Sequence, residues 1–263
     1  MLTLSINSIG VPGWDIHRLI QYAADNGVPY VEIRGLENQL DLLALPCFSD
    51  PASVAQIAQV LKAKQVKILS LDLSHRVWDY APAQDDELRR LADLADRLDV
   101  PYLRFFPGGK VQDQADVKRL ADHAMAIVRL LAGYRVELLV ETHDSLVKLD
   151  LLLAMQQAMD KPVGLLWDVV NMMNQGGAEW RQTYASIRPW IRYLHVKDSV
   201  IRNGKIEYRL MFEGDLPMRE LFEHLRAQPE TTIVSLEWEK LWHPELADGE
   251  LAFGDFIHKM RAL

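Results

Sequence analysis

Short apolar runs rich in β-branched residues alternate with longer segments of helical period along the whole chain. Short buried runs bounded by Pro, Gly or Asn are typical of strands, and apolar residues three or four positions apart are typical of amphipathic helices. In three places a Pro directly precedes the apolar run, in "NGVPYVEIR", "RLDVPYLRF" and "MDKPVGLLW". The predicted strands are residues 2–7, 29–34, 67–73, 102–106, 136–141, 163–168, 191–196 and 232–237.

The segments between these strands carry apolar stripes with the spacing of helices. Stripes fall within residues 19–24, 54–61, 88–98, 120–131, 152–159 and 221–225. Asp50-Pro51 is typical of a helix N-cap followed by the first helical residue, and Asn26-Gly27 is typical of a helix C-terminus. These signals separate the predicted helices from the strands around them.

Repeated strand–helix units indicate the fold class. Eight such units in 263 residues suit an α/β protein, a (β/α)8 TIM barrel that forms a single domain over residues 1–263. An open doubly wound sheet is the rival, but no G-x-G-x-x-G follows the first strand. The longest connection, residues 199–217, contains Asn203-Gly204, which predicts a small β-hairpin.

Composition and charge narrow the range of partners. The net charge is −8 and the pI is about 5.5, which argues against broad binding to nucleic-acid phosphates. Cys47 is the only cysteine, and the N-terminal residues lack the features of a signal peptide. No run approaches the roughly 18 apolar residues of a membrane span. We expect a cytoplasmic protein with no nucleic-acid or membrane partner; the oligomeric state stays open, a homo-oligomer included.

Four successive predicted strands end on residues that can bind metal ions. They are Glu141 in "LLVETHD", Asp168 in "GLLWDVVN", His195 in "YLHVKD" and Glu237 in "SLEWEK". Taken singly, a strand-end carboxylate is often an N-cap or a solvated loop residue, and a strand His is often a core residue. Together they would gather three carboxylates at one rim of a barrel, which is costly without a cation. The pattern predicts one divalent ion, manganese, magnesium or cobalt, since carboxylate and imidazole suit hard or borderline metals.

The motifs "VETHD", "LWDVVN", "LHVKDS" and "LEWEK", in this order, carry a resemblance over nearly the whole chain. The chain resembles the xylose isomerase-like TIM barrels, which include ketose 3-epimerases and the inosose and dehydroshikimate dehydratases. The resemblance implies that Glu141 and Glu237 bind the metal and exchange the substrate proton. Asp168 and His195 would be ligands only. One departure is Asn171, which stands where several members have a His.

Further polar residues lie on or near the strand ends. Side chains two apart on a strand share a face, so His143 should point with Glu141, and Lys197 with His195. Arg34 and Arg104 have two interpretations, as ion-pair partners of the carboxylates or as a fork for a substrate anion. The predicted substrate-binding residues are Arg34, His75, Arg104, His143, Asn171, Lys197, Lys240 and His243.

These residues predict a metal-dependent isomerase or epimerase acting on a keto-sugar or related hydroxy-carbonyl carbohydrate through a metal-stabilised enediolate. The alternative is a lyase, a dehydratase or decarboxylase of an oxidised sugar or keto-sugar acid, because the same intermediate can expel water or carbon dioxide. An endonuclease IV-like nuclease is disfavoured by the net charge of −8 and only eight histidines. A non-catalytic sugar-binding barrel is the remaining alternative. In each carbohydrate case the partner is a small molecule, neutral or anionic, and the sequence does not identify it.

Overall fold

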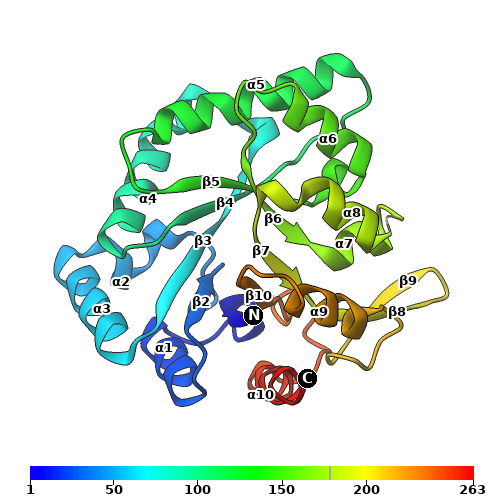
Figure 1. Ribbon diagram of the computed structural model, residues 1–263. Coiled ribbons are helices and arrows are strands. Elements are labelled where there is room, and N and C mark those ends of the chain that lie inside the picture. The colour runs from blue at the N-terminus through cyan, green and yellow to red at the C-terminus, as the bar shows by residue number, and fades with distance from the viewer. Residues whose placement is uncertain (178) are drawn as a thin grey trace. The chain divides into compact units, whose positions relative to one another are not determined.

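The computed structural model describes residues 1–177 and 179–263. Within these residues eight strands form a closed parallel barrel in the order β1-β10-β7-β6-β5-β4-β3-β2, with helices around it (Figure 1). The strands are β1 (Leu2–Asn7), β2 (Tyr30–Ile33), β3 (Lys67–Arg76), β4 (Tyr102–Phe106), β5 (Glu137–Glu141), β6 (Gly164–Asp168), β7 (Ile191–Val196) and β10 (Thr232–Leu236). The predicted TIM barrel is confirmed, and β3 is longer than the sequence pattern predicted.

Two compact units share these strands. The first unit comprises residues Met1–Leu69 and Tyr193–Leu263, and the second unit comprises Ser70–Arg192. The first unit holds β1, β2, β10 and most of β7, and the second holds β4 to β6 and most of β3. The expectation of a single domain over residues 1–263 stays a prediction.

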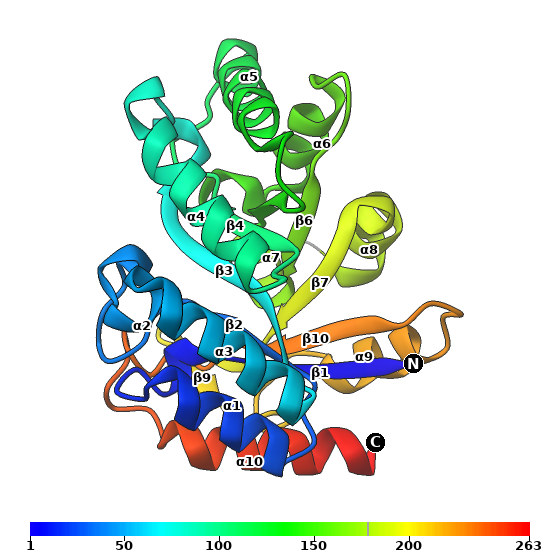
Figure 2. The ribbon, with the colours of Figure 1, turned by 90° about the vertical axis from the view of Figure 1, so that its left-hand side faces the viewer.

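In the first unit, helices α1 and α10 lie side by side (Figure 2). The Tyr22 and Phe253 rings are 6.0 Å apart at this contact. Both helix-end predictions are confirmed: Asp50 accepts a hydrogen bond from Ser53 N at 2.8 Å, and Gly27 has a φ of 57° beyond the end of α1. The helices of this unit are α1 (Ile16–Asp25), α2 (Pro46–Ser49), α3 (Pro51–Lys64), α9 (Met218–Arg226) and α10 (Gly249–Ala262).

In the second unit, α5 and α6 pack beside each other (Figure 1). The helices of this unit are α4 (Asp85–Arg97), α5 (Gln114–Leu131), α6 (Leu149–Gln157), α7 (Val169–Asn174) and α8 (Trp180–Ile187). Short 3-10 helices occupy Ser8–Gly10, Leu42–Ala44, Val77–Asp79, Pro82–Gln84, Asp144–Val147 and Arg188–Trp190. Along the described part of the chain, no helix combines the length and the apolar character needed to traverse a bilayer.

A hairpin follows β7 in the first unit. Strands β8 (Asp198–Arg202) and β9 (Lys205–Arg209) pair antiparallel, and Asn203 and Gly204 form the turn between them with φ values of 51° and 73°. Positive φ at both central residues is the signature of the tight hairpin turn that Asn-Gly favours. The predicted hairpin is confirmed.

Helix α10 begins directly against the backbone of the segment that follows β1. A Cβ atom added to Gly249 would lie 1.8 Å from the carbonyl oxygen of Gly10 and 2.8 Å from Val11 Cγ1. A Cβ added to Gly10 would lie 2.8 Å from two atoms of the Phe253 ring. This pair of glycines therefore lets the start of α10 approach closer than any larger residue would allow.

We expect Gly249→Ala to destabilise the protein, because the new methyl group meets a backbone carbonyl that cannot rotate away. Overpacking costs about 1–3 kcal/mol, and each kcal/mol lowers the Tm of a protein of this size by about 2–4 °C. Gly133→Ala is the control, since no atom lies within 4 Å of its added Cβ. Thermal unfolding followed by circular dichroism checks this, and equal Tm values for the two variants would contradict it.

Candidate active site

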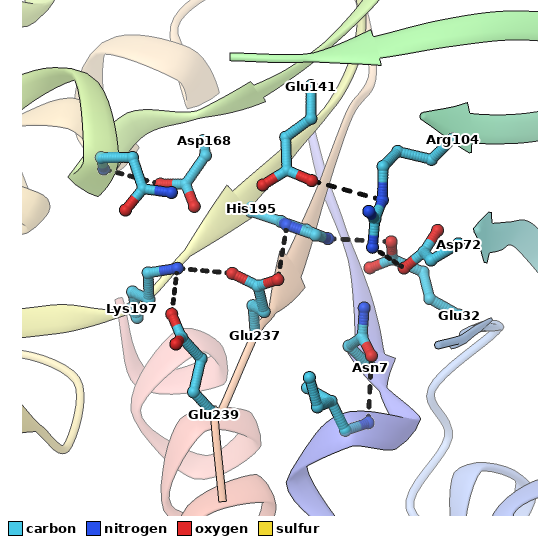
Figure 3. A network of polar contacts seen from close by, with 12 residues as sticks. Asn7, Glu32, Asp72, Arg104, Glu141, Asp168, His195, Lys197, Glu237 and Glu239 are labelled. Carbon is cyan, nitrogen blue, oxygen red and sulfur yellow. Dashed lines mark hydrogen bonds and ion pairs between the residues drawn. The ribbon is translucent and has the colours of Figure 1, made fainter. Parts of the chain in front are cut away.

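In the first unit, the carboxyl ends of β7 and β10 bring His195 and Glu237 together (Figure 3). The two strands pair in parallel, with His195 opposite Ser235. His195 Nδ1 lies 3.3 Å from Glu237 Oε1, and the imidazole is fully buried. The apolar run before Glu237 forms β10 and thus places this carboxylate at the carboxyl end of the strand, beside His195 of the adjacent strand β7.

Lys197 lies between two carboxylates of the same unit (Figure 3). Its Nζ donates a hydrogen bond to Glu237 Oε2 and lies 2.8 Å from Glu239 Oε1. The lysine is buried, so its charge is stabilised by these two partners rather than by water. Lys197 therefore fixes one oxygen of Glu237.

The charges around Glu237 and His195 shift both acid–base equilibria in favour of the ionised forms. Burial alone would raise the pKa of Glu237, but His195 and Lys197 hold this pKa well below its ordinary value. Burial would likewise lower the pKa of His195, and the carboxylates of Glu237 and Glu32 instead raise this pKa well above its ordinary value. Glu237 is thus a carboxylate at neutral pH.

In the second unit, Arg104 is an internal partner of two carboxylates (Figure 3). Its Nε lies 3.2 Å from Glu141 Oε2 at the end of β5, and its Nη2 lies 3.8 Å from Asp72 Oδ2. Nη1 donates to the carbonyl of Leu73 at 3.2 Å, and the guanidinium is fully buried. These contacts favour the ion-pair interpretation of Arg104 over a fork for a substrate anion.

Asp168 ends β6 and also begins helix α7. Its Oδ1 accepts a hydrogen bond from Asn171 N at 2.8 Å, so the residue is the N-cap of the helix. The Thr142 hydroxyl accepts from Asp168 N at 2.9 Å and fixes the backbone there. The Asn171 amide oxygen accepts from Gln175 Nε2 at 3.3 Å. One oxygen of Asp168 is therefore engaged by the helix, and Asn171 lies in its first turn.

The two other predicted histidines of the second unit lie beside phenylalanine rings. His143 Nδ1 is 3.1 Å from Asp144 Oδ1, and its ring is 4.9 Å from that of Phe106. Burial would lower the pKa of His143, but Asp144 and the nearby carboxylates raise it to about 9. His75 instead lies 3.5 Å from Glu87 on α4 and 5.7 Å from the Phe105 ring, contacts that favour a structural role.

Lys240 holds the loop that follows Glu239. Its Nζ donates to the carbonyl oxygens of Pro244, at 2.6 Å, and Leu246. His243 lies in the same loop, with Nδ1 3.3 Å from Glu245 Oε1 and Nε2 3.8 Å from Glu239 Oε2. Lys240 thus shapes its own loop, while His243 adjoins the carboxylate that binds Lys197.

Arg34, at the end of β2, lies beneath an exposed tryptophan of this loop. Its guanidinium carbon is 6.0 Å from the Trp242 ring centroid. The Arg34 side chain is buried, whereas Trp242 is 49% exposed. Trp242 is therefore an exposed aromatic neighbour of the buried Arg34 guanidinium.

Glu32 is the main site residue that the sequence patterns did not reveal. Its Oε2 lies 2.9 Å from His195 Nε2. A carboxylate inside the apolar run "YVEI" was the available signal, because such a group needs a buried partner. Asp72 in "SLDL" is a second carboxylate of this kind.

The predicted ligands fit a divalent ion in number and chemistry. Glu141, Asp168, His195 and Glu237 are a buried group of side chains that could hold a metal ion. His195 Nδ1 makes no hydrogen bond of good geometry to the described residues. Carboxylate oxygens with one imidazole nitrogen suit magnesium, manganese, cobalt or zinc. A second group, Glu32, Asp72 and His195, shares the histidine.

Comparison with known proteins gives the family. The model of one family, the xylose isomerase-like TIM barrel, matches residues 20–255. The chain belongs to the xylose isomerase-like TIM barrel family. The resemblance carried by the four strand-end motifs is thereby confirmed. A search of curated proteins found no match.

Solved structures of this family share the fold at low sequence identity. A probable 3-DHS dehydratase, AsbF, from Bacillus anthracis is 18% identical with a TM-score of 0.78, covering 96% of this chain and 97% of its own. The IOLI protein with a bound zinc atom is 15% identical with a TM-score of 0.78, covering 96% and 94%. D-allulose 3-epimerase from Methylomonas sp. in complex with D-allulose is 17% identical with a TM-score of 0.72, covering 99% and 96%. Family members thus include an epimerase and a probable dehydratase.

We expect Asp168→Asn to weaken metal binding without unfolding helix α7. Asn is as good an N-cap as Asp, so the bond to Asn171 N is kept while one ligand charge is lost. Manganese at about a hundred times its Kd should stabilise the wild type by about 2.7 kcal/mol, seen as a rise in Tm. The variant should lose most of this rise at the same concentration.

Asp113→Asn is the matched control for this prediction. Asp113 caps helix α5 in the same unit, accepting from Ala115 N and Asp116 N at 2.9 and 3.0 Å. The control should keep the full manganese-induced rise in Tm. A full rise in Asp168→Asn as well would remove Asp168 from the ligand set.

Proposed function

We propose that this family member is a divalent-metal-dependent isomerase or epimerase of a keto-sugar or related hydroxy-carbonyl carbohydrate. One observation supports the proposal above all. Each candidate acid–base glutamate has one oxygen in contact with the charged end of a buried Arg or Lys side chain. Arg104 Nε is 3.2 Å from Glu141 Oε2, and Lys197 Nζ donates to Glu237 Oε2. A proton-transfer group must be held in one orientation, and these contacts provide that.

Glu141, Asp168, His195 and Glu237 would hold the ion. When bound there, such an ion would polarise a substrate carbonyl and make the neighbouring C–H bond more acidic. Glu237, ionised at neutral pH, takes the proton from that carbon, and the C–H electron pair forms the double bond of an enediolate. Lys197 keeps the outer oxygen of Glu237 in place and can donate a hydrogen bond to the oxygen on which charge develops.

The return of the proton decides the product. Glu141, oriented by Arg104 and starting as the carboxylic acid, delivers its proton to the opposite face of the same carbon, which inverts its configuration and gives epimerisation; exchange with water then returns both glutamates to their starting states. Delivery to the adjacent carbon, with the hydroxyl proton passing to the other oxygen, instead moves the carbonyl and gives isomerisation. The D-allulose bound to a structurally similar epimerase supports a sugar as the substrate class.

A lyase is the second candidate, supported by the similarity to a probable dehydratase and by Lys197. A departing hydroxyl group must be protonated, and a buried ammonium beside Glu237 and Glu239 can supply that proton. The enediolate electron pair would then expel water. Mass spectrometry of the product separates the two functions, because isomerisation and epimerisation leave the mass of the substrate unchanged.

We expect Glu237→Gln to retain the ion, with reduced affinity, and to lose substrate C–H exchange. The amide oxygen can still bind a metal, but the amide is no base, so exchange should fall by about 10²–10⁴-fold. The assay is exchange into keto-sugars and keto-sugar acids in deuterated water with added manganese. Glu245→Gln, an exposed change in the following loop, is the control and should keep full exchange. Wild-type exchange in Glu237→Gln would make Glu237 a ligand only and assign the base to Glu141, Lys197 or His143.

Arg34 and Arg104 should respond differently to substrate charge. If Arg34 binds an anionic group under Trp242, Arg34→Met should lower kcat/KM for acidic substrates by about 1.5–3 kcal/mol and affect neutral sugars much less. Arg104→Met should reduce kcat/KM for both classes alike, because it removes the partner of Glu141. Steady-state kinetics on a neutral sugar and its acid checks this. Equal losses in Arg34→Met would indicate a structural arginine.

A further inference from the structure

A buried chain of hydrogen bonds runs from Tyr193 through Glu32 to His195 in the first unit, and Figure 3 shows its contact between Glu32 and His195. Glu32 Oε2 lies 2.9 Å from His195 Nε2 and accepts a hydrogen bond from the Tyr193 hydroxyl at 2.7 Å. All three side chains are fully buried. The carboxylate of β2 thus holds the imidazole from the side opposite Glu237, which faces Nδ1 at 3.3 Å.

The barrel interior is shaped to let Glu32 reach across to His195. Ser5 of β1 pairs with Ser235 of β10, and Ser235 pairs with His195. Both serines are fully buried. On β2 this row ends at Tyr30, and Glu32 pairs with Asn7 two positions further along, on the same side of the sheet. Two small side chains therefore lie on the two strands that separate Glu32 from His195.

The chemistry of this contact determines which imidazole nitrogen carries the proton. Glu32 Oε2 accepts a hydrogen bond from the Tyr193 hydroxyl at 2.7 Å and faces His195 Nε2 at 2.9 Å, so this oxygen acts as an acceptor. His195 Nε2 must then donate, whether the ring is an imidazolium or neutral. A metal that takes the place of the Nδ1 proton binds the lone pair left on that nitrogen, while Nε2 keeps its proton.

We propose that Glu32 is a positioning residue that holds His195 with Nε2 protonated and Nδ1 presented to the metal. The inference rests on the metal site proposed above and is independent of whether the enzyme is an isomerase or a lyase. Tyr193 supports the arrangement by fixing the same carboxylate oxygen, and its ring packs edge-on to the imidazole at 5.9 Å.

A competing use of Glu32 is as a ligand of a second ion, with Asp72 and His195. The contacts within the first unit argue against it. An Nε2 that donates to Glu32 has no lone pair for a metal, so His195 cannot be a ligand on that side. Asp72 for its part has Arg104 Nη2 at 3.8 Å as a cationic neighbour.

The test compares Glu32→Leu with Glu32→Gln. Leu cannot accept the Nε2 hydrogen bond, and loss of such a partner typically weakens metal binding 10–100-fold. Gln keeps an oxygen in the position that accepts from Tyr193 and His195, so it should restore most of the affinity. Calorimetric titration with manganese gives the Kd and stoichiometry, and Glu137→Gln, at a half-exposed carboxylate paired with Arg192, is the control.

A second readout follows the tautomer directly. Nitrogen NMR of 15N-histidine-labelled protein, with His195 assigned from His195→Gln and magnesium as a diamagnetic ion, should show a protonated Nε2 in the wild type and Glu32→Gln. Glu32→Leu should lose this pattern. Should Glu32→Leu fail to fold, Glu32→Asp replaces it, because the shorter carboxylate keeps the charge but not the reach.

Each outcome decides between the proposals. Equal manganese affinity and an unchanged tautomer in Glu32→Leu would overturn the positioning role and leave the metal site standing. No manganese binding by the wild type would overturn both. Two equivalents of manganese in the wild type and one in Glu32→Leu would also overturn the positioning role, because Glu32 would then be a ligand.

Discussion

Carboxylates buried in the barrel need compensating charge, and each unit supplies it from its own strands. In the first unit, His195 and Lys197 face Glu237, with Glu32 and Glu239 on their other sides. In the second unit, Arg104 faces Glu141 and Asp72. A buried carboxylate without a partner costs several kcal/mol, so these pairings are a condition for placing acidic groups at the strand ends at all.

The same pairings set the geometry on which any chemistry depends. A carboxylate in water rotates freely, whereas Glu237 and Glu141 each have one oxygen held by a cation from a neighbouring strand. His195 is held from behind by Glu32 in the same way. Charge compensation and orientation are therefore provided by the same contacts, and changing one member alters both.

The sequence indicated which residues stand at strand ends. It did not indicate which side chains contact each other from different strands. Glu141, Asp168, His195 and Glu237 could be found because parallel strands of a barrel end at one rim. An ion pair between Arg104 and a carboxylate was one of two interpretations of the sequence, but which carboxylate it contacts depends on strand register and on the length of a flexible side chain. Glu32 was missed for the same reason, since His195 is far from it in the chain.

The remaining differences between the sequence predictions and the structure lie in the length of β3, the short helix α7 and the loop of Lys240. His75 was placed just beyond the third predicted strand, but β3 continues to Arg76, and His75 contacts Glu87 of α4. Helix α7 is too short to show an apolar stripe, and it begins at Asp168, which had been assigned only as a ligand. Lys240 was expected near the substrate, but its ammonium turns back onto two carbonyls of its own loop.

The hydrogen bonds of the Lys240 ammonium affect the loop that carries Trp242 and His243. Because the ammonium ties together the carbonyls of Pro244 and Leu246, the loop owes its shape to an internal tether as well as to the barrel beneath it. Trp242 and His243 take no part in this tether, but each adjoins a charged group, Arg34 and Glu239 respectively. A change at either residue therefore alters the surroundings of one charged side chain while the path of the loop is kept.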